Sequence, residues 1–176
     1  MNLEREVKLL DVDVQKIKEK LRVLGARKIA ERNMRRYVFD ISPDKPKSWI
    51  RLRDNGLKTT LTVKEWVGGI AGAKEFEVEV SDFEATRKIL EELGFPFKAY
   101  QENRRISYEL DGVQVEIDFW PMIPPYVEVE AETEDEIEKV VKLLGFTMEQ
   151  TSTLQTVQIY KAHGLDIYSF KELKFE

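Results

Sequence analysis

The chain has 176 residues, of which 42% are hydrophobic and 35% charged, and its formal net charge at pH 7 is -5. This length predicts a single domain, 1–176, and the negative charge argues against broad attraction to nucleic acid. The absence of cysteine excludes disulfides and thiolate ligands, so we expect any metal to bind through oxygen. No apolar run approaches the roughly 20 residues that span a bilayer, and no signal-like segment leads the chain. We therefore expect a cytoplasmic protein that makes no contact with a membrane.

In chain order, apolar periodicity predicts a strand at 3–9 and an amphipathic helix at 13–25. Strands follow at 35–40, 48–54, 58–66 and 74–80, and a second helix at 82–94. Three more strands, at 100–110, 113–119 and 126–131, lead to a third helix at 133–145. Thr133 and Glu136 have the spacing of a capping box, and a glycine follows each of the three helices. A short helix is predicted at 156–163, within a tail that is otherwise irregular.

Side chains alternate between the two faces of a strand, so each predicted strand shows which residues share a face. One face is apolar on almost every strand, as in the pairs Ile50 and Leu52 or Phe76 and Val78. Burying each such side chain contributes roughly 1.5 to 3 kcal/mol. We therefore expect the amphipathic helices to cover this face.

The opposite face carries carboxylates and basic side chains almost exclusively. Its residues are Glu4, Glu6, Lys8, Arg51, Arg53, Thr62, Lys64, Glu75, Glu77, Glu79, Asn103, Arg105, Glu116, Asp118, Glu128 and Glu130. A solvated sheet face explains any one strand, but seven strands repeat the pattern. If eight strands close into a barrel, the charged face becomes the lumen. Clustered carboxylates then favour a hard cation such as Mg²⁺ or Mn²⁺, and the basic residues favour a multiply charged anion such as a polyphosphate.

Short motifs recur along the chain in the order found in a known family. They are Glu4-x-Glu6-x-Lys8, Arg36-Tyr37-Val38-Phe39-Asp40, Arg51-x-Arg53, Lys64, Glu75-x-Glu77-x-Glu79, Arg105, Glu116-x-Asp118 and Glu128-x-Glu130. This series resembles the CYTH family, the triphosphate tunnel metalloenzymes, which include class IV adenylyl cyclases, thiamine triphosphatases and inorganic triphosphatases. The resemblance implies an α+β fold in which an eight-stranded antiparallel β-barrel forms a tunnel open at both ends, with the amphipathic helices packed outside.

The resemblance also implies a role for each matching residue of the lumen. Lys8, Arg51, Arg53, Lys64 and Arg105 would hold phosphate oxygens. Glu4, Glu6, Asp118, Glu128 and Glu130 would coordinate metal, with Glu75, Glu77 and Glu116 as supporting or second-metal ligands. Two ions, Mg²⁺ or Mn²⁺, would orient the triphosphate and activate the attacking water or hydroxyl group. Glu4, Glu6 and Lys8 form the catalytic set.

These features predict a divalent-metal-dependent hydrolase of a linear triphosphate, which could be inorganic tripolyphosphate, a nucleoside triphosphate or thiamine triphosphate. A class IV-type cyclase that makes cyclic AMP from ATP is one alternative, and a non-catalytic module that binds polyphosphate or another phosphorylated ligand is a second. Asn103 stands where family members often have lysine, and the His-Phe pair that precedes the first motif in bacterial class IV cyclases is missing. The second departure counts against the cyclase. The expected partner is a small molecule with a triphosphate, and the relatives suggest a homodimer.

Overall fold

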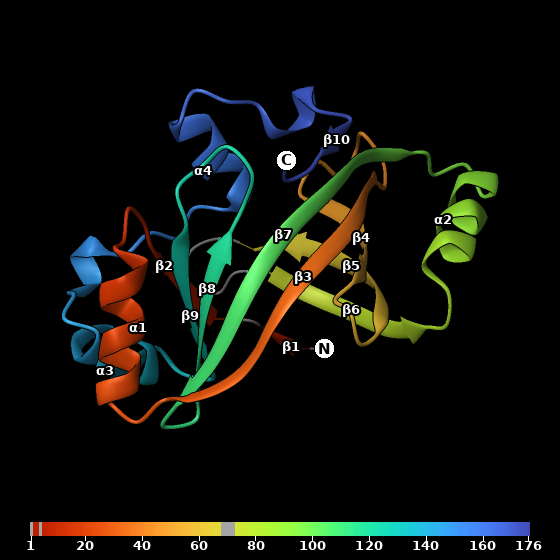
Figure 1. Cartoon of the computed structure of the whole chain (residues 1–176). Coiled ribbons are helices and arrows are strands. Elements are labelled where there is room, and N and C mark those ends of the chain that lie inside the picture. The colour runs from red at the N-terminus through yellow and green to blue at the C-terminus, as the bar shows by residue number, and fades with distance from the viewer. Residues whose placement is uncertain (1, 4, 68–72) are drawn as a thin grey trace.

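One curled sheet dominates the computed structural model of the chain, which describes residues 2–3, 5–67 and 73–176 (Figure 1). Its strands are β1 (Asn2–Leu3), β2 (Arg5–Leu9), β3 (Arg27–Asp40), β4 (Ser48–Asp54), β5 (Thr59–Trp66), β6 (Ala73–Val80), β7 (Phe97–Leu110), β8 (Val113–Phe119), β9 (Tyr126–Ala131) and β10 (Glu172–Leu173). The helices are α1 (Val14–Val23), α2 (Phe83–Glu92), α3 (Glu134–Leu143) and α4 (Thr156–Ala162), with 3-10 turns η2 (Met148–Gln150) and η3 (Ile167–Ser169).

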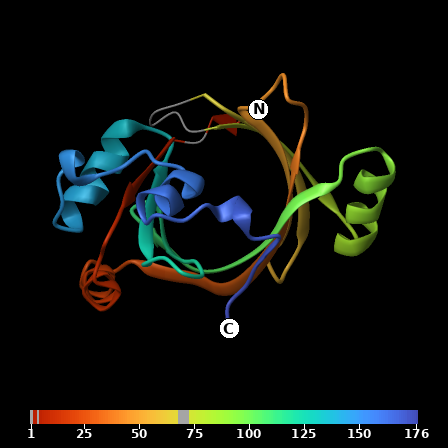
Figure 2. The ribbon, with the colours of Figure 1, turned by 90° about the horizontal axis from the view of Figure 1, so that it is seen from above.

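The sheet curls round until its two edges meet at the N-terminal segment. The strand order is β1-β6-β5-β4-β3-β7-β8-β9-β2, and every neighbouring pair on this path is antiparallel. β1 pairs with β6 and β2 pairs with β9, so both ends of the path come from the first few residues. Seen from above, the strands surround a central space (Figure 2). The predicted α+β class and antiparallel barrel are confirmed.

Two strands are longer than their sequence pattern predicted. β3 and β7 each have 14 residues and pair with each other from Arg27↔Glu109 to Phe39↔Phe97, with irregularities after Lys28 and Val38. Most side chains near the start of β3 are exposed, so this part has no apolar alternation to reveal it. The small strand β10, which pairs with β7 in parallel, was also not predicted.

The helices begin where the sequence predicted. Asp13 caps α1 through hydrogen bonds from the backbone N–H groups of Gln15 and Lys16. Asp82 caps α2 in the same way, and Thr133 and Glu136 form the expected capping box at α3. In the described chain no helix is both long and apolar enough to cross a membrane.

The helices cover the outer face of the barrel unevenly. α1 and α3 pack on β2, β8 and β9, where the buried core includes Val7, Ile117 and Val129. α2 packs near β4, against Phe39 and Leu52.

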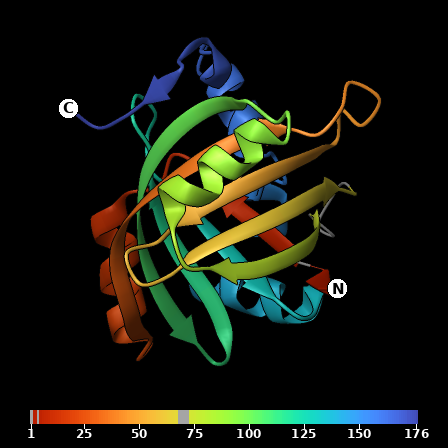
Figure 3. The ribbon, with the colours of Figure 1, turned by 90° about the vertical axis from the view of Figure 1, so that its right-hand side faces the viewer.

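The outer face of β5 and β6 lies beside α2 without a covering helix (Figure 3). Val63 is 37% exposed, Phe76 61% and Val78 57%. The prediction that the helices bury the whole apolar face is therefore wrong for these residues. The physical reason is that α2 follows β6 but lies over β4, and the other two main helices pack on the opposite wall.

The C-terminal tail lies across one end of the barrel (Figure 2). It is fixed there by an apolar cluster that joins Trp120 and Ile123 to Tyr160 and Leu173. The Tyr160 hydroxyl also donates a buried hydrogen bond of 2.6 Å to the carbonyl of Pro121. The predicted short helix is present as α4, and the tail contributes to the lumen wall at an end that the resemblance had implied to be open.

Candidate functional site

The lumen contains a cavity of about 380 Å³ that several strands and the tail share. Among the predicted site residues, those that line it are Glu6, Lys8, Arg51, Lys64, Arg105 and Glu128. Gln155 and Tyr168 of the tail also line it. Residues from β2, β4, β5, β7 and β9 thus face one space, which is what the alternation of charge along the strands indicated.

An acidic cluster, formed by Glu6, Glu116, Asp118 and Glu128, lies on the wall of β2, β8 and β9. Arg105 is at its centre: Nη2 donates to Asp118 Oδ2 and to Glu128 Oε2, both at 2.6 Å, and Nη1 pairs with Glu116. The register places Arg105 opposite Asp118, and Glu116 opposite Glu128. Asp118 is fully buried and the other two carboxylates on β8 and β9 are nearly so. One guanidinium therefore holds three carboxylates from two strands.

Lys8 joins the acidic cluster from β2. Its Nζ lies 2.6 Å from Glu6 Oε1 and 3.2 Å from Glu128 Oε1, and the residue is 3% exposed. Burial and the charge of Glu128 raise the pKa of Glu6 to about 8. Burial would also raise the pKa of Glu128, but Lys8 and Arg105 hold it well below its ordinary value. The cluster thus carries more carboxylates than Lys8 and Arg105 neutralise, which favours an additional cation.

A basic cluster, formed by Arg36, Arg51, Arg53 and Lys64, lies on the wall of β3, β4 and β5. Glu75 and Glu77 of β6 pair with it: Arg51 Nη2 is 3.6 Å from a carboxylate oxygen of each, and Lys64 forms an ion pair with Glu75. Thr62 Oγ1 donates to Glu77 Oε2 at 2.8 Å. These two glutamates, predicted as supporting metal ligands, thus lie beside cations of the basic cluster.

Arg36 is a lumen residue that the sequence reasoning did not assign to the site. Its guanidinium lies 4.7 Å from the centre of the Trp120 ring, and its Nε is buried with no hydrogen-bond partner in the described part of the chain. Burial, followed by the charges of Arg51, Arg53 and Arg105, lowers the pKa of Arg36 to about 9. A bound anion would reduce the repulsion among these arginines and supply the missing hydrogen-bond acceptor. The alternation of side chains along β3 carried this information. Because Arg35 stands next to Arg36, however, the sequence did not show which arginine faces the lumen.

Asn103 connects the two clusters. Its Oδ1 accepts a hydrogen bond from Arg36 Nη2, and its Nδ2 donates to Asp118 Oδ1 at 3.1 Å. The side chain is 1% exposed. Asn103, where the resemblance led us to expect lysine, therefore orients one cation and one carboxylate, and Arg36 brings a positive charge to the same region.

The remaining predicted residues lie at the margin of this site. Glu116 and Asp118 contact Arg105, which lines the cavity, without lining it themselves. Arg53 does not line it either and lies 3.9 Å from Glu77. Glu130 lies opposite Glu6 in the β2–β9 ladder and does not line the cavity. Glu4 falls outside the described residues.

The acidic cluster has the donor chemistry of a site for a hard divalent ion, since its ligands are buried carboxylate oxygens in excess. In the described chain, however, no three carboxylate or histidine side chains are placed to hold an ion as they stand. Lys8 and Arg105 lie between the carboxylates instead. A metal ion would fit once Lys8 and Arg105 bind another anion in place of these carboxylates.

The described residues thus form an antiparallel barrel with a charged lumen, acidic on one wall and basic on the other. The model of the CYTH domain matches residues 2–157, and the chain belongs to this family. Family members are triphosphatases and adenylyl cyclases. No curated protein sequence matched the chain.

Solved structures support the same fold. The PH1012 protein from Pyrococcus horikoshii OT3 is 25% identical, with 89% of this chain and 98% of that one covered and a TM-score of 0.77. A conserved hypothetical protein from Pyrococcus furiosus is 23% identical, with coverage of 89% and 99% and a TM-score of 0.76. HpAC1 from Hippeastrum, described as having a dominant triphosphatase activity, is 17% identical, with coverage of 97% and 100% and a TM-score of 0.63.

Proposed function

We propose that this protein is a divalent-metal-dependent hydrolase that binds a linear triphosphate in the barrel lumen. Candidate substrates are inorganic tripolyphosphate, a nucleoside triphosphate and thiamine triphosphate. The observation that carries the proposal is that a single cavity of about 380 Å³ is lined by Arg51 and Lys64 on one wall and by Glu6 and Glu128 on the other. A polyanion with bound cations is the ligand that satisfies both walls.

The basic cluster supplies the contacts to phosphate. Arginine presents a planar fork of donors that matches two phosphate oxygens, and Arg36, Arg51 and Arg105 all line the cavity. Lys8 and Lys64 add point charges from neighbouring parts of the wall. Phosphoryl transfer depends mainly on positioning and charge neutralisation, so these side chains can provide much of the catalysis without a strong base.

The acidic cluster supplies the oxygen ligands for the ions. Glu6, Asp118 and Glu128 would hold Mg²⁺ or Mn²⁺, with Glu116 in support, and Glu4 and Glu130 remain candidates from the sequence. When bound, such ions neutralise phosphate charge and lower the pKa of a coordinated water. Arg105 would then turn from its carboxylates to the phosphate, and Asn103 would keep Asp118 and Arg36 in place.

A panel of triphosphates incubated with Mg²⁺ or Mn²⁺ tests the proposal, with phosphate release and all organic products measured. We expect phosphate release that chelation abolishes, and about a hundredfold lower kcat/KM in Arg51→Gln, because one charged donor to the reacting group is lost. Arg27→Gln is the matched control, since Arg27, at the start of β3, forms an exposed ion pair with Glu109.

The other outcomes exclude the proposal in different ways. Release of cyclic AMP and diphosphate from ATP would show the cyclase instead. Saturable binding of tripolyphosphate without turnover of any compound in the panel would show a binding module. If Arg51→Gln and Arg27→Gln turn over substrate equally well, the lumen is not the site.

A further inference from the structure

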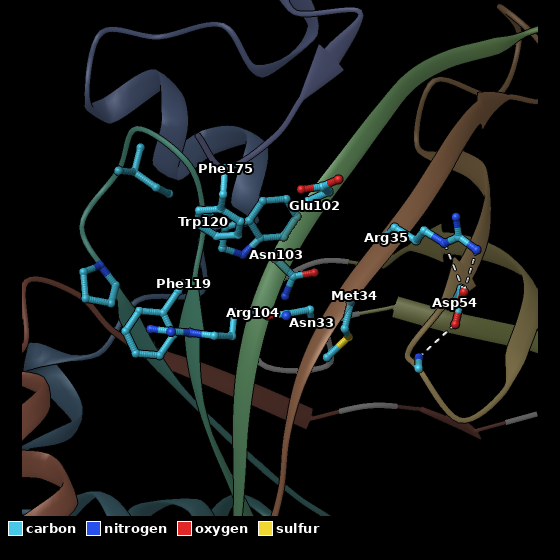
Figure 4. Close-up of a pocket in the computed structure, with 13 residues that line it drawn as sticks. Asn33, Met34, Arg35, Asp54, Glu102, Asn103, Arg104, Phe119, Trp120 and Phe175 are labelled. Atoms are coloured by element: carbon cyan, nitrogen blue, oxygen red, sulfur yellow. Dashed lines mark hydrogen bonds and ion pairs between the residues drawn. The ribbon is translucent and has the colours of Figure 1, made fainter.

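A second cavity, of about 640 Å³, lies along the β3–β7 ladder. The lumen residue Asn103 lines it, as do Arg35 of β3 and Glu102 and Arg104 of β7, three residues that alternate with Arg36, Asn103 and Arg105 of the lumen clusters. They therefore belong to the outer face of the ladder. Figure 4 shows Phe119, Trp120 and Phe175 on one side of the ladder and the Arg35–Asp54 pair on the other.

The cavity forms because neighbouring strands leave the ladder at this point. β8 pairs with β7 only as far as Arg104↔Phe119, and β4 pairs with β3 only as far as Arg35↔Asp54. The rim loop after Phe119, together with Phe175 of the tail, supplies the remaining wall. The volume lies within the range of roughly 300 to 1,000 Å³ that is usual for small-molecule sites.

The walls of this cavity suit a flat, uncharged ring. The Arg104 guanidinium lies 4.2 Å from the centre of the Phe119 ring, and Phe175 is an exposed aromatic side chain beside Trp120 (Figure 4). Aromatic rings and arginine planes are the surfaces on which bases stack. A stacked ring would bury Phe175, which is 44% exposed.

Polar groups at the cavity match the edge of a base better than a phosphate. The charges of Arg35 and Asp54 neutralise each other through a contact of 3.0 Å, and Glu102 and Arg104 contribute one charge of each sign to the wall. A polyanion would therefore meet little net attraction here, whereas the Glu102 carboxylate can accept a hydrogen bond from the amino group of a base.

We propose that this outer cavity is a nucleoside-binding site, distinct from the triphosphate site and independent of the hydrolase proposal. The base stacks among Phe119, Phe175 and the Arg104 guanidinium, and its amino group donates a hydrogen bond to the Glu102 carboxylate. Trp120 lines both cavities, and its ring faces Arg36 in the lumen.

Calorimetric titration with adenosine and with guanosine tests this site, because neither nucleoside carries a phosphate for the lumen to hold. The titrations are repeated with excess tripolyphosphate and a chelator, so that any polyanion site in the lumen is occupied. We expect at least one nucleoside to bind under both conditions. Phe175→Ala and Arg104→Ala should each weaken binding about tenfold, in line with the loss of one stacking surface.

Phe76→Ala serves as the control, because Phe76 is an exposed aromatic residue on the uncovered outer face of β6. This variant should bind the nucleoside as the unchanged protein does. Absence of binding by both nucleosides overturns the proposal. Binding that Phe175→Ala and Arg104→Ala leave unchanged, or that tripolyphosphate abolishes by competition, overturns it as well, because the nucleoside would then occupy another place.

Discussion

The two walls of the barrel have the same alternation of apolar and charged side chains. They differ in what covers the outer face and in which charges line the lumen. On the wall of β2, β8 and β9, the outer side chains are buried under α1 and α3, and the inner carboxylates gather round Lys8 and Arg105. On the wall of β4, β5 and β6, Phe76 and Val78 face outward without cover, and the lumen cations of β4 and β5 pair with the glutamates of β6. Alternation therefore specifies which residues share a face, and the placement of helices decides which faces are buried.

We expect the largest loss of stability from a substitution of Asp118 in the acidic cluster. Asp118→Ala removes a fully buried partner of Arg105 and leaves the guanidinium with fewer counter-charges. Loss of one partner of a buried pair costs about 3 to 5 kcal/mol, which urea denaturation of the metal-free protein can measure. The exposed pair of Lys139 and Asp111 supplies the control. Asp111→Asn should change stability far less, and equal losses in the two variants would show that Asp118 is solvated.

A second prediction compares the outer faces of the two walls. Ile117→Ala leaves a cavity beneath the helices, because Ile117 is completely buried, and should cost about 3 kcal/mol. Phe76→Ala removes a larger side chain that is 61% exposed, and should cost less than about 1 kcal/mol. Thermal and urea unfolding of both variants measure the difference. A large loss in Phe76→Ala would show that this face is covered in solution, as in the homodimer that the relatives suggested.

A third prediction concerns Asn103, which connects the acidic and basic clusters. Asn103→Ala removes the acceptor from Arg36 and one donor from Asp118, so both lose their orientation while keeping their charge. We expect kcat/KM for the best triphosphate to fall about tenfold, corresponding to the roughly 1 to 3 kcal/mol of an unsatisfied buried group. Asn103→Gln, which retains the amide, should recover part of the loss. If both variants keep full activity and the same pH profile, Asn103 has no positioning role.

A further difference is expected in how the stability of the metal-free protein depends on pH. The pKa of Glu6 is raised from 4.5 to about 8, so the folded state retains a proton that the unfolded chain releases near pH 4.5. The stabilisation from this proton is complete below pH 4.5 and is lost as the pH rises through about 8. Glu6→Gln should therefore flatten the fall in stability between these two values. An unchanged slope would place Glu6 in contact with solvent.

Much of this architecture was accessible from the sequence, because local rules produce it. The caps of Asp13 and Thr133 and the alternation on the strands predicted the elements and the charged lumen. The pairing of cations with carboxylates across the cavity was not predictable, since it depends on strand register. Arg36 and the tail residue Gln155 were missed for other reasons. Arg36 lies beside Arg35 in the sequence, and Gln155 reaches the lumen only through the packing of α4.

The meeting of both sheet edges at the N-terminal segment has a consequence for how the protein folds. Arg5 donates a hydrogen bond to the carbonyl of Glu132, a contact between residues 127 positions apart in the chain. Such distant pairing is slow to form, because the chain pays the entropy of a long loop before it gains the contact. Until then the edges of β6 and β9 lack their neighbours and can pair with strands of other molecules. Refolding should therefore become less efficient as protein concentration rises.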